Sequence, residues 1–290
     1  MSIADAKERL PPIRPSSTLP AWRAKFNRGQ EHRDVLKRFI TETLANEANL
    51  PTLGRKFDAA TQQHVLYVNR APDLSELYSR VGVIFGDCIN NFRNALDYLV
   101  HEMGTRHTAN TGGLKHPDRI KFPILTKKEG WPGVEGKELR EVSEKQRKMI
   151  ERLQPYHGLD LEQDAPQGQV PYHPLAMLRE LTDFDKHRLL TAVAVPHGDA
   201  LALGPMGWAM INSGLCQIMH ADHSGLPVEL GAEIWRAKLP DDAPKDEVEM
   251  AGRIDSLVIL TQAHKRPVIP LIDTLAAMVS KTILELESTF

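Results

Sequence analysis

Residues 73–103 carry the pattern that most constrains the fold, an apolar stripe that keeps the period of an α-helix along the whole stretch. At about 100° per residue, its large side chains fall on one side, which predicts a long helix packed against a core. Asp73, three residues before Glu76, forms a capping-box arrangement and predicts the start of the helix. Gly104 predicts its end, because glycine is favoured just past a helix. The stripe consists of Phe85, Cys88, Phe92, Leu96, Leu99 and Met103.

Other segments divide into helices and strands by the spacing of their apolar residues. The further helices are predicted over Ala21–Ala45, from Ser143 and Gln146 to just before Pro155, over Leu175–Arg188 and over residues 268–288. Strands are predicted near His64–Val68 and at Ile120–Leu125. A series of further strands separated by turn residues follows, at Leu189–Val195, Ala200–Leu203, Trp208–Ile211, Leu215–Met219, Val228–Leu239 and Glu247–Leu260.

This order of elements predicts an α+β fold, in which a helical bundle-like N-terminal half packs with an antiparallel β-sheet and a C-terminal helix closes the structure. We expect one domain over residues 19–290, with a helical part at 19–188, the sheet at 189–260 and the closing helix at 268–288. Residues 1–18 contain several prolines and little apolar pattern, so they are expected to form an irregular arm.

Composition excludes several classes of protein. The net charge is −2, from 36 basic and 38 acidic side chains, so contact with RNA or DNA would need a local basic patch. Cys88 and Cys216 are too few for a disulfide framework, which favours a reducing compartment. No apolar run reaches the length of a membrane helix, and the N-terminus has no hydrophobic signal segment. We therefore expect a cytoplasmic protein with no membrane partner.

Two charged triplets stand out on the predicted helices. Arg93, Asp97 and His101 follow one another at intervals of four residues, and Arg179, Asp183 and His187 repeat the pattern on another helix. In each triplet the central carboxylate can reach both neighbours, one turn away on either side. Asn90 and Asn94 flank the first triplet on the same stripe and are candidate ligand-binding residues.

If the two helices face one another, the triplets predict a shared catalytic centre. Asp97, His101, Asp183 and His187 would suit a divalent metal ion, with Arg93 and Arg179 supporting the ligands. Without a metal, the arginines would stabilise a phosphate and the histidines would transfer protons. The same spacing is also typical of a solvated helix face, where each pair contributes about 0.2–0.5 kcal/mol.

Other polar residues are assigned smaller roles. Asp185 and Arg188, three residues apart near the apolar side of their helix, are expected to form a structural ion pair. His220, Asp222 and His223 precede Ser-Gly, so a hairpin turn is favoured over a metal site. His32 lies toward an apolar face and is expected to be a core histidine.

The stretches Gly86–Asp97 and Leu178–Arg188 resemble the two signature segments of a family of uncharacterised bacterial proteins. Phe122–Ile124 and Leu153–Gly158 fit the same resemblance, which spans residues 20–195 and implies no established activity. Arg93 followed by Asn94 is also distantly similar to the HEPN superfamily, helical bundles that include metal-independent ribonucleases. There a histidine follows the arginine after four to six positions, whereas seven residues separate Arg93 from His101.

Three hypotheses follow. The first is an enzyme, either a HEPN-like ribonuclease acting on phosphodiesters or a metal-dependent hydrolase. The alternatives are a non-catalytic protein that binds a small ligand and a structural or assembly protein. The expected partners are a small anionic ligand or RNA, and the chain is a candidate for a homodimer. The candidate cofactor is a divalent metal ion.

Overall fold

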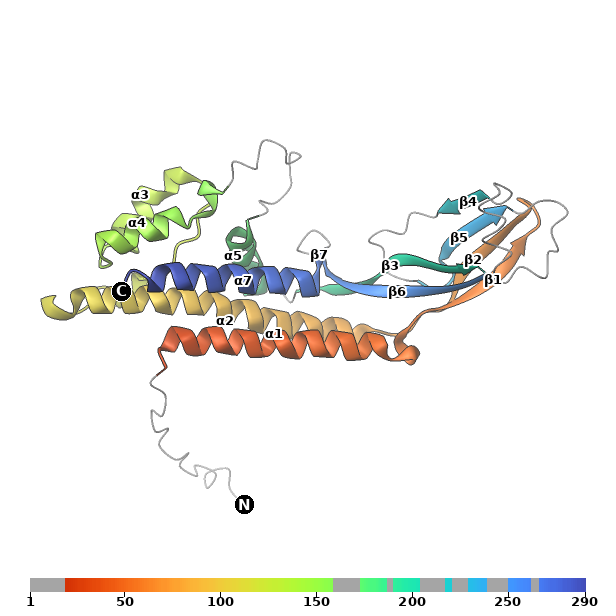
Figure 1. Ribbon diagram of the computed structural model, residues 1–290, viewed down its shortest axis with the longest axis horizontal. Helices are drawn as coiled ribbons and strands as arrows, with labels where there is room; N and C mark the ends of the chain where they lie inside the picture. Colours follow the sequence, from red (N-terminus) through yellow and green to blue (C-terminus); the bar gives the residue numbers. More distant parts are fainter. Residues whose placement is uncertain are drawn as a thin grey trace, which may run out of the picture.

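The computed structural model describes residues 19–158, 173–186, 190–203, 217–220, 229–238, 250–261 and 266–290. Long helices lie side by side in one half of the molecule, and the strands gather at the other end (Figure 1). The α-helices are α1 (Ala21–Ala45), α2 (Ser75–Thr108), α3 (Trp131–Lys137), α4 (Glu144–Arg152), α5 (Pro174–Asp185) and α7 (Val268–Glu287). Short 3-10 helices are η2 (Glu47–Asn49), η3 (Ala109–Thr111), η4 (Pro117–Arg119), η5 (Lys128–Gly130) and η6 (Pro155–His157). The predicted α+β fold class is confirmed.

The apolar stripe of α2 is the centre of the core, as predicted. Phe85, Phe92 and the rest of the stripe are fully buried, and α1, α5 and α7 all contact this helix. Burying one such side chain contributes about 1.5–3 kcal/mol, so the stripe is a major source of stability. Apolar side chains of the neighbouring helices complete the core, including Trp22, Leu36, Ile40, Leu175, Leu178, Leu181, Leu271, Leu275, Val279 and Ile283.

Both predicted ends of α2 are wrong. Asp73 Oδ1 accepts the Ser75 N–H at 3.0 Å, but the residue before the first helical turn is Leu74 and no capping box forms. The helix continues past Gly104 to Thr108. A Cβ at Gly104 would lie 3.1 Å from Ile120 Cδ1, so this glycine allows the chain after α2 to pack closely against the helix. A small residue at a packing contact gives the same sequence signal as a helix end.

The strands form two antiparallel sheets instead of the single predicted one. The first has the order β1-β2-β5-β4 and the second β3-β6-β7. Their bounds are β1 (Thr52–Asp58), β2 (Gln63–Arg70), β3 (Ala192–Leu203), β4 (Gln217–His220), β5 (Glu233–Lys238), β6 (Met250–Leu260) and β7 (Arg266–Pro267). The strand predicted near His64–Val68 is confirmed as part of β2, which pairs with β1 and β5 although it lies within the part of the chain expected to be mainly helical. The sheet is therefore not confined to residues 189–260.

Individual predictions differ in their outcome. The helices at α1, α4, α5 and α7 are confirmed, and Ser143 caps α4 by accepting the Gln146 N–H at 3.4 Å. Ile120–Leu125 is not a strand, since it has no paired neighbour. His32 is half-buried and lies outside the core. Trp208–Ile211, Asp222 and His223 lie outside the described residues, as do Arg188 and residues 1–18.

Gly29 lets α1 approach α2 closely. A Cβ at this position would lie 2.5 Å from Cε1 of the buried Phe92 ring, which has no room to move aside. We expect Gly29→Ala to lower the free energy of unfolding by about 1–3 kcal/mol, measured by urea denaturation. Gly133→Ala in α3 is the control, because a Cβ there meets nothing within 4 Å. Equal midpoints for both variants would contradict this packing.

The lowered pKa of His173 is expected to make the stability of the fold depend on pH. Its Nδ1 accepts the Leu175 N–H at 3.3 Å at the start of α5, and burial, with a smaller effect of Lys281, lowers its pKa from the usual 6.5. The folded protein therefore binds fewer protons than the unfolded chain as the pH falls through 6.5, and the free energy of unfolding decreases. His173→Asn, which keeps a neutral capping acceptor, is expected to lose this component between about pH 7 and pH 5. An unchanged pH profile in urea denaturation would refute the assignment.

Candidate functional site

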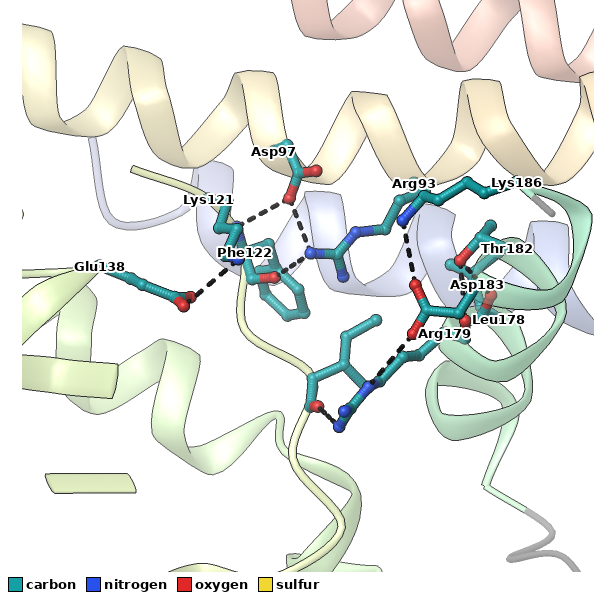
Figure 2. A network of polar contacts seen from close by, with 11 residues as sticks. Arg93, Asp97, Lys121, Phe122, Glu138, Leu178, Arg179, Thr182, Asp183 and Lys186 are labelled. Atoms are coloured by element: carbon teal, nitrogen blue, oxygen red, sulfur yellow. Dashed lines mark hydrogen bonds and ion pairs between the residues drawn. The ribbon is translucent and has the colours of Figure 1, made fainter. Parts of the chain in front are cut away.

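The extended segment Lys121–Leu125 connects the two charged triplets. It lies between α2 and α5, and the side chains of Phe122 and Ile124 are buried. Buried peptide groups need hydrogen-bond partners, and this segment has no neighbouring strand to supply them. Side chains from three parts of the fold replace that strand, as Figure 2 shows for α2 and α5.

On the α2 side, Arg93 and Asp97 bind both polar groups of one peptide residue. Arg93 Nη2 donates to the Phe122 carbonyl at 2.5 Å, and Asp97 Oδ1 accepts the Phe122 N–H at 2.9 Å. The two side chains also form an ion pair at 3.0 Å, and only 17% and 25% of their surfaces are exposed. The first two members of this triplet therefore act as a clamp on the main chain.

On the α5 side, Arg179 Nη1 donates to the Ile124 carbonyl at 2.9 Å. Asp183 lies between two cations, 3.7 Å from Arg179 Nε and 3.0 Å from Lys186 Nζ. A further contact comes from the buried Gln154, whose Oε1 accepts the Leu125 N–H at 2.9 Å. Arg93, Asp97 and Arg179 thus bind the backbone of one segment, and Asp183 joins them through its ion pair with Arg179.

A cavity of about 350 Å³ opens between α2, α5 and this segment. Its charged lining residues are four cations and three carboxylates, namely Arg93, Lys121, Arg179 and Lys186 against Asp97, Glu138 and Asp183. Asn90 and Asn94 line it as well. Lys121 Nζ lies 3.4 Å from Glu138, across the cavity from α5. We call this space the cationic cavity, because its lining carries one excess positive charge.

Burial raises the pKa of the Asp97 carboxyl, while Arg93 and the Phe122 N–H oppose the rise. The Asp97 side chain is 25% exposed, against 56% for Asp183. Removal from water disfavours a charged carboxylate unless partners replace the lost hydration. Asp97 thus depends on Arg93 and the Phe122 peptide for its charge.

Asp185 occupies a place that the sequence pattern did not predict. Asn90 Nδ2 donates to its Oδ2 at 2.7 Å, and a Cβ at Gly86 would lie 2.6 Å from its Oδ1. The absence of a side chain at Gly86 therefore lets the carboxylate rest on α2. The expected partner Arg188 lies outside the described residues. The hydrogen bond to Asp185 uses the Asn90 amide nitrogen, so that one donor of Asn90 is not free for a ligand.

The histidines of the triplets do not line the cationic cavity within the described part of the chain. His101 lines a second cavity of about 670 Å³, and His187 falls among the residues that are not described. Over the described ranges, no three His, Cys, Asp or Glu residues are grouped as metal ligands. Because two cations flank Asp183, the described members of the predicted set, Asp97, His101 and Asp183, do not fit a metal ion.

The unequal burial of the two arginines leads to a graded prediction. Arg93→Ala leaves the Phe122 carbonyl without its donor and Asp97 without its ion-pair partner, and is expected to lower the free energy of unfolding by about 2–3 kcal/mol. Arg179 is 51% exposed, so Arg179→Ala should cost only about 0.5–1 kcal/mol. Lys148→Ala, which breaks an exposed pair with Glu144, is the control and should cause no measurable change. Equal losses of stability for Arg93→Ala and Lys148→Ala in urea denaturation would show that the contacts of Arg93 with Phe122 and Asp97 do not stabilise the fold.

Comparison with known proteins found no matching family model, no matching curated protein and no matching solved structure. The resemblance to a family of uncharacterised bacterial proteins, and the more distant one to HEPN proteins, therefore stays a prediction. No helix among the described residues combines the length and apolar character needed to cross a membrane. The function has to be argued from the geometry of the site.

Proposed function

We propose that this protein binds a small anionic ligand, a phosphate or carboxylate, in the cationic cavity between α2 and α5. The observation that carries the proposal is the charge of the lining, where four cations face three carboxylates. Asn94 adds an amide that makes no hydrogen bond with any described residue, so it can donate to a ligand oxygen. An anion entering this cavity would meet an excess of donors.

The cations differ in their freedom to contact a ligand. Arg93 is fixed on the Phe122 carbonyl, whereas Lys121 and Lys186 are 55% and 57% exposed and take part in surface ion pairs. Such exposed pairs contribute about 0–1 kcal/mol each, so an ammonium group can exchange its carboxylate for a ligand at little cost. We therefore assign ligand recognition to Lys121, Lys186 and Asn94, and orientation of the cavity wall to Arg93 and Arg179.

Binding is better supported than catalysis. A metal-independent ribonuclease needs a group that transfers protons beside the phosphate, and His101 lines the other cavity. A metal-dependent hydrolase needs a ligand set that the described residues do not form. The ribonuclease, the hydrolase and the homodimer stay predictions, as does RNA as a partner. A cytoplasmic location is also proposed, supported by the free, buried thiol of Cys88.

Isothermal titration calorimetry with inorganic phosphate and pyrophosphate tests the proposal. The full chain is expected to bind, and added salt should weaken the binding because the recognition is electrostatic. Lys186→Ala and Lys121→Ala should each lower the affinity by about three- to tenfold, the equivalent of roughly one ion pair. Lys148→Ala removes an exposed lysine outside the cavity and should leave the affinity unchanged.

Three results would count against this function. Failure of the folded protein to bind either anion, or equal weakening by Lys186→Ala and Lys148→Ala, would remove the cationic cavity as the site. Cleavage of single-stranded RNA that disappears in His101→Ala, without loss of folding, would favour the enzyme instead.

A further inference from the structure

The second cavity shares Asp97 and Lys121 with the lining of the cationic cavity. It has a volume of about 670 Å³ and is bounded by the start of α1, the C-terminal third of α2 and the segment that begins with η4. Cavities of this size hold a complete small molecule and usually combine apolar walls with a few polar groups. The apolar part of the lining comes from Ala21, Pro117 and Ile120, with the ring of Tyr98.

Carboxylates outnumber cations in this second cavity. Asp97, Glu102 and Asp118 line it together with the single ammonium group of Lys121, which pairs with Glu138 of the cationic cavity. Asp97 and Glu102 have arginine partners, Arg93 and Arg106. That leaves Asp118 without a hydrogen-bond or ion-pair partner among the described residues. Its negative charge is available for a ligand.

Tyr98 supplies a surface that also favours positive charge. The side chain is 45% exposed, and its residue lies on the wall of the second cavity. Lys25 Nζ already lies 5.9 Å from the centre of the ring, within the range of a cation–π contact. The ring of Tyr98 therefore has the environment in which aromatic faces attract a cation.

We propose that the second cavity is a separate binding site for a small organic cation, an amine attached to an apolar body. The apolar body contacts Ile120, Pro117 and Tyr98, and the ammonium group pairs with Asp118. This inference is independent of the anion proposed for the cationic cavity, because it depends on Asp118 and Tyr98, which that cavity does not contain. The two sites differ in the sign of the charge they select.

Three probes with the same aromatic body separate charge selection from hydrophobic binding. Benzylamine is a cation at neutral pH, benzyl alcohol is neutral and benzoate is an anion. Binding to the full chain is measured by NMR line broadening of the probe and by calorimetry. Benzylamine is expected to bind about fivefold to tenfold more tightly than benzyl alcohol, the effect of roughly one ion pair. Benzoate should be the weakest ligand of this cavity, and its displacement by phosphate would assign any residual binding to the cationic cavity.

Variants locate the site. Asp118→Asn should weaken benzylamine binding by about fivefold and leave benzyl alcohol unchanged, because only the charge is removed. Tyr98→Leu should weaken both ligands. Asp87→Asn is the matched control, since Asp87 is an exposed carboxylate of α2 that lies outside both cavities. Equal binding of benzylamine and benzyl alcohol, no binding of benzylamine, or equal effects of Asp118→Asn and Asp87→Asn would overturn the proposal. Intact phosphate binding beside such a result would leave the function of the cationic cavity standing.

Discussion

Hydrogen bonds between side chains and the backbone of Phe122–Leu125 hold the region around both cavities in place. This stretch runs through the interior without a neighbouring strand, so its polar groups need partners from elsewhere. Arg93, Asp97, Arg179 and Gln154 bind four of these groups, and Pro123 has no N–H to satisfy. Because the donors and acceptors come from α2, α5 and the end of α4, the same bonds also fix how these elements stand relative to one another.

The four-residue spacing of Arg and Asp gains its meaning from this arrangement. On each helix the aspartate pairs with the arginine one turn away, and the guanidinium then reaches a carbonyl of the same extended segment. An arginine has several donors in one plane, so it can hold a carboxylate and a carbonyl together. The repeated pattern is thus explained by a shared structural role, and the cavity between the clamps is its consequence.

The sequence allowed the longer helices to be predicted and pointed to the arginines and aspartates that line one cavity, but it did not predict the contacts that hold them there, and His101 lines the other cavity. Helical periodicity identifies α2 and its buried face, because burial directly selects apolar residues at that spacing. It cannot separate Gly104, needed for a close contact with Ile120, from a helix end. Strand β2 pairs with β5, which lies more than half the chain away, and the sequence near either strand does not indicate that pairing. Likewise, nothing in the sequence around Asp185 indicates that Gly86 and Asn90 would receive its carboxylate.

The division between buried and exposed charges explains how a cavity can bind ligands without weakening the fold. Arg93 and Asp97 are largely removed from water, so exchanging their partners would leave a buried charge uncompensated. Lys121, Lys186 and Asp118 are at the surface of the cavities, where changes of partner cost little. Asp97 and Lys121 line both cavities, and Asp97 is the more buried of the two, with 25% of its side chain exposed against 55% for Lys121. Under the two proposals made above, a ligand that draws Lys121 away from Glu138 in the cationic cavity would also change the charge that lines the second cavity.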